Sequence, residues 1–275
     1  MPGKLCLVGT PIGNLGDMSP RALRALEEAD FIAAEDTRVT LKLLNHFNIK
    51  KPLVSYYEHN ARSAGERILE RILAGENCAL VTDAGMPSVS DPGEDLAARC
   101  AEAGVELTAV PGPCAAVTAL ALSALPAGRF CFEGFLSTSG RSRREHLESL
   151  KGERRTMVFY EAPHKLVKTL EDLRAAFGPE RRIALCREMT KLHEEVVRST
   201  LGEAAALYAE TPPRGEFVLV VEGAAEARAE FGREEALALV ERRRAEGMSL
   251  KEACRLTAEE TGIKKNELYQ WALNA

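Results

Sequence analysis

The sequence predicts an α/β protein with a parallel-sheet N-terminal domain, a second α+β domain and a C-terminal helical module resembling a helix–turn–helix. Three observations predict this. Short apolar runs alternate with amphipathic segments in the first 125 residues, which is typical of parallel strands with helices on both faces. The pattern changes near Leu125-Pro126, and the tail carries apolar residues at helical spacing. We expect domains at 1–125, 126–223 and 233–275, with a linker at 224–232.

Each expected strand of the first domain is a short apolar run. The expected helices have recognisable ends: Ser19-Pro20 is a typical N-cap followed by a first helical proline, and Gly75 is a typical stop. The expected strands are 4–8, 31–36, 77–83 and 105–110, and the expected helices are 19–29, 40–47, 63–75, 95–104 and 114–125.

The second domain is expected to hold a sheet of its own and a helix from Pro163 to Gly178. Residues 140–155 form a charged segment with six basic and three acidic residues, which fits either a flexible loop or a solvated helix face. In the tail, helical spacing on both sides of Thr261-Gly262 indicates two helices joined by a turn. The expected strands are 129–136, 156–162, 181–188, 194–200 and 216–223.

Composition narrows the class of protein. The chain is 45% hydrophobic and 28% charged, which is typical of globular proteins. Its net charge of −5 argues against an extensive basic surface, so any nucleic-acid contact should be a local patch. The seven cysteines form no CxxC pair, and no apolar stretch has the length of a signal peptide or membrane span. The histidines show no metal-ligand spacing. We therefore expect a soluble cytoplasmic protein with reduced cysteines and no metal.

Three loops follow predicted strands, at the edge where open α/β sheets bind ligands. GTPIGNLGD (9–17) is rich in glycine but matches neither the P-loop nor GxGxxG. TDAGMPSVSDPG (82–93) combines a glycine that can present its backbone with two stiffening prolines. PGPCAAVTAL (111–120) brings small residues to a helix start. Taken singly, each loop could also be a tight turn or a site of close packing.

These loops, with EDT, FYEAPHKL, CREMTKLHEE and RGEFVLVVEG in the same order, resemble the tetrapyrrole methylase superfamily over essentially the whole chain. Within it, the EDTR, SDPG and YEAPH variants are similar to members that methylate a cytidine ribose 2′-oxygen in small-subunit (16S) ribosomal RNA. Members acting on porphyrin precursors tend to show Gly-Asp-Pro where this chain has Gly85-Met86-Pro87. The resemblance implies a two-domain tetrapyrrole-methylase-like fold, S-adenosyl-L-methionine bound in the cleft between domains, and a homodimer.

The resemblance also implies which residues contact the cofactor. Loops rich in backbone groups suit this ligand, because they offer N–H and C=O groups without excess charge. A core position for Tyr160 and a simple bulge at Gly215-Glu216 are the structural alternatives. The implied residues are Pro11, Gly85, Met86, Val89, Cys114, Ala115, Tyr160, Gly215 and Glu216.

A ribose hydroxyl scarcely ionises at neutral pH, so a base or an oxyanion stabiliser should lie beside it. Glu161 directly follows the strand VFY and is the expected base or water-positioning residue. Arg187 or Lys191 is expected to hold a phosphate or the developing alkoxide, although strand-end ion pairs are usually structural. Glu188, Glu194 and Glu195 are further candidates, and His164 is expected to be a capping or surface residue.

Basic residues that could neutralise RNA phosphates are concentrated in the 140–155 segment. The alternative is a helix face on which Glu145 and Glu148 pair with them. The low aromatic content, 5%, limits a large base-stacking platform. For the helical tail, RNA docking, dimer formation and simple packing remain alternatives. The expected RNA contacts are Arg38, Arg141, Arg143, Arg144, Lys264 and Lys265.

The expected function is therefore 2′-O-methylation of a cytidine in 16S ribosomal RNA, with the small ribosomal subunit as partner and no membrane contact. Three rivals remain. Methylation of a tetrapyrrole precursor would leave the basic segment and the tail without use. A nicotinamide-dependent oxidoreductase is disfavoured by the missing GxGxxG spacing. A non-catalytic ribosome-binding protein would bind RNA equally well without cofactor.

Overall fold

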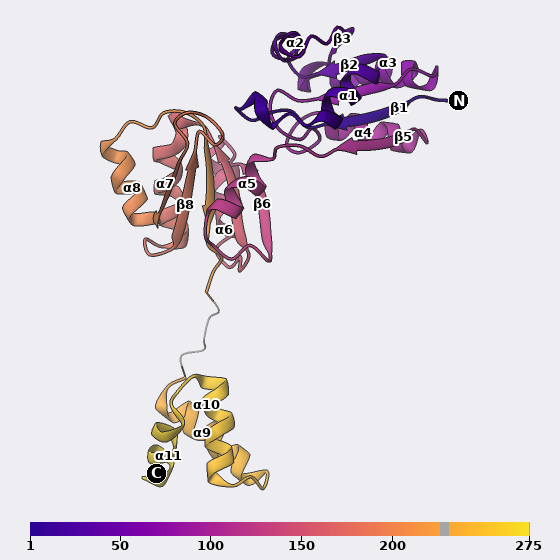
Figure 1. Ribbon diagram of the computed structural model, residues 1–275. Helices are drawn as coiled ribbons and strands as arrows, with labels where there is room; N and C mark the ends of the chain where they lie inside the picture. The colour runs from indigo at the N-terminus through magenta and orange to yellow at the C-terminus, as the bar shows by residue number, and fades with distance from the viewer. Residues whose placement is uncertain (226–230, 275) are drawn as a thin grey trace. The chain divides into compact units, whose positions relative to one another are not determined.

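The computed structural model describes residues 1–225 and 231–274. They belong to two compact units, Met1–Ala224 and Ala225–Ala275. The first unit contains two five-stranded sheets and the second is helical (Figure 1). Most of the expected linker, residues 226–230, lies outside the described residues. The expected boundary at residue 125 stays a prediction.

The first sheet is entirely parallel, with strand order β3-β2-β4-β1-β5, as the alternation of strands and helices predicts. Among the strands of this sheet only β3 was not predicted, because its three residues are too few for a clear apolar run. The elements are β1 (Lys4–Val8), α1 (Pro20–Glu28), β2 (Phe31–Ala34), α2 (Thr37–His46), β3 (Leu53–Ser55), α3 (Ala61–Leu73), β4 (Cys78–Val81), α4 (Gly93–Glu102) and β5 (Glu106–Val110), with 3-10 turns at Leu15–Asp17 and Glu58–Asn60.

Helices cover both faces of this sheet, which explains the uninterrupted apolar strands. In β4, Cys78 and Leu80 pack in the core that includes α3 and α4. The alternate residues Ala79 and Val81 pack with α1 and α2. Because neighbouring strand residues point to opposite faces, every position of β4 is buried.

Side-chain caps fix where the first helices begin. Ser19 Oγ accepts a hydrogen bond from Ala22 N at 3.1 Å, which confirms the expected N-cap of α1. Asp36 Oδ1 accepts one from Arg38 N at 2.8 Å. Helix α2 therefore begins at Thr37, three residues before the expected start at 40, and β2 ends at Ala34.

The second sheet is mixed, with strand order β6-β7-β10-β8-β9. Strands β6 and β7 are parallel, and the remaining neighbours are antiparallel. Residues 140–149 form a helix, α6, so the alternative of a flexible loop there is wrong. The elements are α5 (Ala115–Leu122), β6 (Phe130–Phe135), α6 (Gly140–Ser149), β7 (Thr156–Glu161), α7 (Pro163–Phe177), β8 (Arg182–Arg187), β9 (Glu195–Thr200), α8 (Leu201–Glu210) and β10 (Phe217–Val221).

The two faces of the second sheet have different helical partners. Met157 and Phe159 of β7 pack in a core with α6, α7 and α8. Val158 and Tyr160 belong to the opposite face, with α5. This alternation decides which side chains at the strand ends can reach a common site.

Strand β6 carries a bulge. Its pairing with β7 runs from Phe132 opposite Val158 directly to Gly134 opposite Phe159, so Glu133 is an extra residue. Gly134 has φ 61°, a left-handed conformation that glycine adopts without steric cost. Phe135 then lies opposite Tyr160. The bulge thus places Phe132 and Phe135, three residues apart, on the face that α5 covers.

The C-terminal unit consists of α9 (Arg233–Ala245), α10 (Leu250–Thr261) and α11 (Lys265–Leu273). Val240, Cys254 and Leu268, one from each helix, are fully buried in its small core. Gly262, with φ 73°, ends α10, which confirms the turn expected there. Across residues 1–225 and 231–274, no helix is both long and apolar enough to cross a membrane.

Candidate active site

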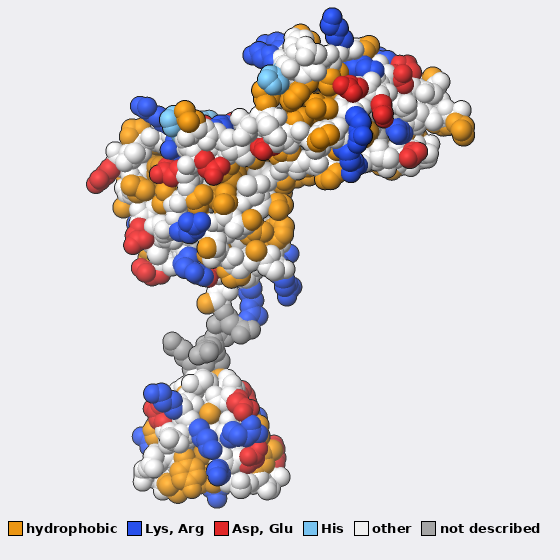
Figure 2. Space-filling model, viewed as in Figure 1, with side chains coloured by type: hydrophobic (Ala, Val, Ile, Leu, Met, Phe, Trp, Pro, Cys, Tyr) orange, Lys and Arg blue, Asp and Glu red, His pale blue; other side chains and the backbone are white. Residues whose placement is uncertain are grey.

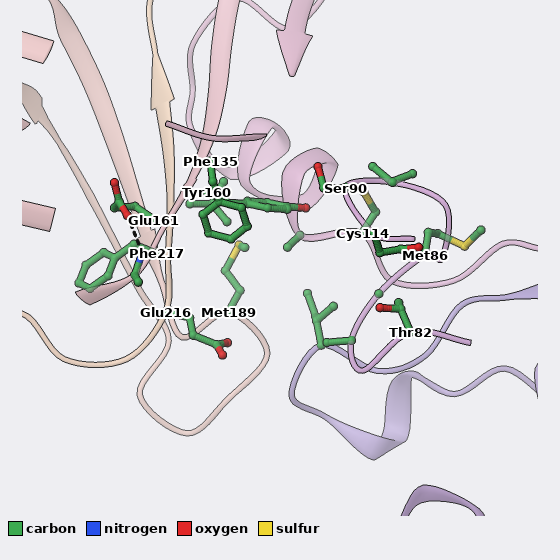
Figure 3. A pocket seen from close by; sticks show the side chains of 18 of the residues that line it. Thr82, Met86, Ser90, Cys114, Phe135, Tyr160, Glu161, Met189, Glu216 and Phe217 are labelled. Carbon is green, nitrogen blue, oxygen red and sulfur yellow. Dashed lines mark hydrogen bonds between the residues drawn. The ribbon is translucent and has the colours of Figure 1, made fainter. Parts of the chain in front are cut away.

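A cavity of about 480 Å³ lies where the edges of the two sheets of the first unit converge (Figure 3). This volume is typical of small-molecule sites. The first sheet contributes residues 12, 35, 82, 84–86, 89–91 and 114–115. The second contributes residues 135, 160–163, 188–189, 191 and 216–218.

Strand direction explains why these residues meet. In the first sheet they follow the carboxyl ends of β1, β2, β4 and β5, which share one edge. In the second sheet they lie at or just after the ends of β6, β7 and β8 and at the start of β10. Strand β10 is antiparallel to β7 and β8. Phe217 at the start of β10 therefore pairs with Glu161 at the end of β7 and with Arg187 at the end of β8.

Main-chain contacts fasten the first-sheet loops to one another. Thr10 N donates to Gly85 O at 2.9 Å, and Gly85 N donates to Thr10 O at 3.2 Å. A Cβ on Gly112 would lie 2.8 Å from the Cα of Gly9, so neither loop tolerates a side chain there. Gly112 N also donates to Met86 Sδ at 3.2 Å. The three loops singled out in the sequence therefore form one tightly packed assembly.

Strained backbone is concentrated in two loops at the cavity. Six non-glycine residues in the described chain have positive φ, and four of them lie in the loops after β4 and β8. These four are Ser88, Ser90, Glu188 and Thr190. Such conformations cost about 1–3 kcal/mol each and gather at binding sites.

The same loops contain polar atoms without partners. In the described part of the chain, the buried atoms Ser88 Oγ, Asp91 Oδ2 and Thr190 Oγ1 make no hydrogen bond. Asp91 Oδ1, in contrast, accepts from Ser88 N at 3.0 Å and from Gly93 N at 2.7 Å. Burial raises the pKa of Asp91, against the opposing effect of these backbone donors. Unsatisfied groups beside a cavity are expected where a ligand supplies the missing partners.

Carboxylates outnumber cations among the lining residues. Lys191 Nζ donates to Glu188 Oε1 and to Glu216 Oε2, both at 2.9 Å. Burial acts to lower the pKa of Lys191, but these hydrogen bonds outweigh it and the pKa is raised. Lys191 lowers the pKa of Glu188 in turn. With Glu35 and Asp91 also lining it, the cavity favours a ligand that carries positive charge.

Tyr160 forms an aromatic wall of the cavity and points toward Cys114 (Figure 3). Its hydroxyl accepts a hydrogen bond from Ala116 N at 3.2 Å. Its ring packs edge-on against Phe132 and Phe135, with centroids 5.0 and 5.6 Å away. Burial raises the pKa of Tyr160, so its hydroxyl stays protonated at neutral pH.

The structure brings most of the expected cofactor residues together. Pro11 and Gly215 are not among the lining residues, although their neighbours Ile12 and Glu216 are. Gly215, with φ 82°, leaves room for Glu188, to which Glu216 N donates at 2.9 Å. The expected residues that line the cavity are Gly85, Met86, Val89, Cys114, Ala115, Tyr160 and Glu216.

Glu161 belongs to the lining, but its carboxylate points away from the cavity (Figure 3). It follows Met157 and Phe159 on the face that packs against α6 and α7. Its carboxylate accepts from Ala162 N at 2.9 Å and from the hydroxyl of Thr169. This placement counts against Glu161 as the base.

The other expected catalytic residues fall into two groups, those with a charged group at the cavity and those that lie outside it. Arg187 is not among the lining residues, and its Nε donates to Glu195 at 3.0 Å. Glu194 accepts from Thr190 N at 2.6 Å, and His164 is an exposed residue in the first turn of α7. Lys191 and Glu188 are thus the catalytic candidates whose charged groups lie at the cavity.

The expected RNA contacts lie away from the cavity lining. Arg143 is only 7% exposed and donates to Asp172 at 2.6 Å and to Thr169 at 2.7 Å, which counts against a phosphate contact. Arg141 is exposed and pairs with Glu145 at 2.8 Å. On the face drawn in Figure 2, basic and acidic side chains are interspersed. Arg38, Arg144, Lys264 and Lys265 are exposed or half-buried.

Sequence reasoning missed several lining residues, above all Phe135 and Met189. Phe135 was inside an expected strand, and only the bulge in β6 turns it to the cavity face. Met189 follows Glu188 at the end of β8, a position that could have been inferred from the strand end. Of the residues that the structure describes, no group of three or more His, Cys, Asp or Glu is placed to hold a metal ion.

Comparison with known families gives two matches along the chain. The family described as Tetrapyrrole (Corrin/Porphyrin) Methylases matches residues 4–205. An RsmI C-terminal HTH domain matches residues 232–275. Together the two matches cover the first sheet, four strands of the second sheet and the helical unit, and β10 (Phe217–Val221) lies between them.

Curated relatives match almost the full length. Ribosomal RNA small subunit methyltransferase I of Synechocystis sp. (strain ATCC 27184 / PCC 6803 / Kazusa) is 48% identical over 272 residues, covering 98% of each chain. The protein of the same name from Escherichia coli O157:H7 is 45% identical over 273 residues, covering 98% of this chain and 95% of that one.

Solved structures share the fold over about four fifths of the chain. Uroporphyrin-III-C-methyltransferase from Thermus thermophilus is 26% identical, with a TM-score of 0.57 over 80% of this chain and 94% of that chain. A diphthine synthase is 17% identical, with a TM-score of 0.62 over 80% and 90%. A T. thermophilus uroporphyrin-III C-methyltransferase in complex with S-adenyl homocysteine is 19% identical, with a TM-score of 0.56 over 80% and 97%.

Proposed function

The chain belongs to the tetrapyrrole methylase family, and from this premise we propose that it uses S-adenosyl-L-methionine to methylate the ribose 2′-oxygen of a cytidine in 16S ribosomal RNA. Relatives named ribosomal RNA small subunit methyltransferase I support the reaction class and the RNA. The observation that carries the proposal is the cavity to which the converging edges of both sheets contribute.

The cavity fits the cofactor in shape and charge. S-adenosyl-L-methionine combines a flat nucleoside, an amino-acid head and a cationic sulfonium. The small residues Gly85, Cys114 and Ala115 leave room for a flat group. The excess of carboxylates suits the cation. Ser88 Oγ and Thr190 Oγ1, in the loops beside the cavity, are unsatisfied and could bind polar parts of the ligand.

The cofactor supplies an activated methyl group on a cationic sulfur. The protein must place the ribose oxygen in line behind that carbon and exclude water. We propose that Lys191 stabilises the negative charge that develops on the ribose oxygen as its proton passes to the Glu216 carboxylate, which lines the cavity beside Lys191. The raised pKa of Lys191 keeps it protonated, and Glu188 and Glu216 fix its position. Arg187 and Glu161 are left out of this role because other side chains engage them.

We propose that RNA is gripped outside the cavity by exposed or half-buried basic residues of both units. Arg141 and Arg144 begin α6, and Lys264 and Lys265 begin α11. Arg38 is 87% exposed, although it pairs with Asp36. The match of the second unit to a helix–turn–helix family supports a docking role for it.

We further propose that the protein acts in the cytoplasm as a homodimer. The ribosomal substrate supports the location, and the family resemblance supports the dimer. Light scattering coupled to size-exclusion chromatography would test the dimer, and a monomeric mass at micromolar concentration would contradict it.

The main experiment is methyl transfer from radiolabelled S-adenosyl-L-methionine. Small ribosomal subunits, naked 16S RNA and a tetrapyrrole precursor are offered side by side, and labelled RNA is digested to nucleosides. We expect the label in 2′-O-methylcytidine. Label in the macrocycle alone would overturn the substrate, and label on a base would overturn the position of transfer.

Calorimetry separates cofactor binding from substrate choice. We expect S-adenosyl-L-methionine to bind in the absence of RNA, and NADH to give no heat of binding. The reverse result would favour an oxidoreductase. RNA binding without any cofactor binding would favour a non-catalytic ribosome-binding protein.

A further inference from the structure

We infer that Phe135 and Val89 form a subsite for the unpaired base of the nucleoside whose ribose is methylated. The inference rests on the proposed function and deepens it, because it defines the state of the RNA that can enter. The substrate would be a nucleotide splayed out of its strand, with its base in the cavity and its phosphates outside.

Exposure sets these two side chains apart from the other large apolar side chains of the lining. Phe135 is 60% exposed and Val89 is 45% exposed, although both line the cavity. Met189 and Phe217, which also line it, are buried. An exposed aromatic ring at a cavity is a surface on which a base can stack.

The two side chains come from different sheets, Phe135 from the end of β6 and Val89 from the loop after β4. A Cβ built on Gly134, beside Phe135, would lie 3.4 Å from Ser90 Oγ, beside Val89. The end of β6 and the loop after β4 therefore touch at this point. Each wall thus presents an exposed apolar side chain next to a residue of this contact, Val89 from one wall and Phe135 from the other.

An irregularity in the backbone of β6 determines the direction in which Phe135 points. In a strand of regular alternation, Phe132 and Phe135 would point to opposite faces. The bulge at Glu133 and the left-handed backbone of Gly134 bring both to the cavity face, edge-on to Tyr160. Bulges next to active sites commonly re-aim a side chain in this way.

Charge decides which part of the RNA can enter. Glu35, Asp91, Glu188 and Glu216 line the cavity against the single cation Lys191. Phosphates would be repelled there, whereas a neutral base and its ribose would not. A paired nucleotide keeps its base inside the helix, so the target must be unpaired or flipped out.

The test compares the F135A and F135W variants with F130A as matched control. Phe130 lies in the same strand and is 39% exposed, but it is not among the lining residues. Two quantities are measured: kcat/KM for small subunits at saturating cofactor, and the Kd of S-adenosyl-L-methionine by calorimetry. Thermal melting checks that each variant folds.

We expect F135A to lower kcat/KM for subunits about tenfold or more, by loss of a stacking surface. The Kd for the cofactor should stay within about twofold, and F135W should retain most activity because any flat ring can stack. F130A should match the wild type.

Three results would overturn the inference. If F135A leaves kcat/KM unchanged, no base stacks on Phe135. If F135A weakens cofactor binding by the same factor as kcat/KM, Phe135 belongs to the cofactor site instead. If the wild type binds the cofactor but puts no label into RNA, the proposed function fails and the subsite fails with it.

Discussion

The two sides of the cavity present different chemistry. The side from the first sheet consists of tightly packed loops. Gly9 and Gly112 are in contact, and main-chain hydrogen bonds link Thr10 and Gly85. The side from the second sheet presents side chains, among them Tyr160 and Lys191. The shape of the first side is thus set by the backbone, whereas the second side is defined by aromatic and charged side chains. This difference predicts where substitutions harm folding, binding or turnover.

The largest expected effect is on the free energy of unfolding. It concerns the hydrogen bonds that Arg143 makes behind the second side of the cavity. Replacing Arg143 with Ala removes the partner of Asp172 and Thr169, and Thr169 in turn holds the Glu161 carboxylate. We expect the free energy of unfolding to fall by about 3 kcal/mol, because the half-buried Asp172 carboxylate and the buried Thr169 hydroxyl each lose a hydrogen-bond partner. Urea unfolding measures it.

Arg141→Ala is the matched control, since Arg141 lies in the same helix and forms an exposed pair with Glu145. It should change the free energy of unfolding by less than about 0.5 kcal/mol. Equal losses for the two variants would show that the buried network gives the second side no special support.

The next effect concerns turnover. Lys191→Met removes the ammonium that we propose for the ribose oxygen, and kcat should fall by about 100-fold. Cofactor affinity should change little. Exposed Lys168, outside the lining, provides the control K168M, which should leave kcat unaltered. A wild-type rate for K191M would remove this charge from the reaction.

The third effect concerns the backbone of the first side. Gly112→Ala places a Cβ 2.8 Å from the Cα of Gly9, and backbone must shift to relieve the clash. We expect a loss of about 2 kcal/mol in the free energy of unfolding and weaker cofactor binding. In the control G128A, the new methyl group meets nothing within 4 Å. If calorimetry finds cofactor affinity unchanged in G112A, the loops do not shape the binding site.

The smallest effect is a pH dependence. Burial raises the pKa of Asp91 above its ordinary value, so the folded state prefers the neutral carboxyl. Its contribution to stability is full below the ordinary pKa and is lost as pH rises through the raised one. Asp91→Asn stays neutral and keeps an oxygen for Ser88 N and Gly93 N.

The variant should therefore lose less stability than the wild type between about pH 4 and about pH 7, with a difference within about 1 kcal/mol. Urea unfolding at both pH values measures it. Parallel losses in the two proteins would show that Asp91 titrates normally.

Much of the fold could be predicted from the sequence, because apolar runs and helix ends follow local rules. Strands β1 and β4, which begin at Lys4 and Cys78, lie where those rules predict them. The same holds for helix α1, capped by Ser19, and for helix α7, which begins at Pro163. The three residues of β3 carry too little pattern for such a rule. The loops at the cavity were also predictable, since parallel strands end at a common edge.

The direction of individual side chains was harder to predict. Arg143 lies one helical turn before Leu147 on the buried face of α6, a spacing that could have revealed its burial. Alternation along β7 likewise separates Glu161 from Tyr160. The bulge in β6 could not be predicted by local rules, because it exists only in the register with β7.

The irregularity in β6 also leaves a trace that can be recognised in other sequences. Phe132 and Phe135 stand at an odd interval with a glycine between them, an arrangement that ordinary two-residue periodicity would assign to opposite sides. Where homologous chains keep both the interval and the glycine, their second ring should face the cavity, whatever the neighbouring letters are. The interval between two aromatic residues can therefore determine which face of the sheet the second ring occupies.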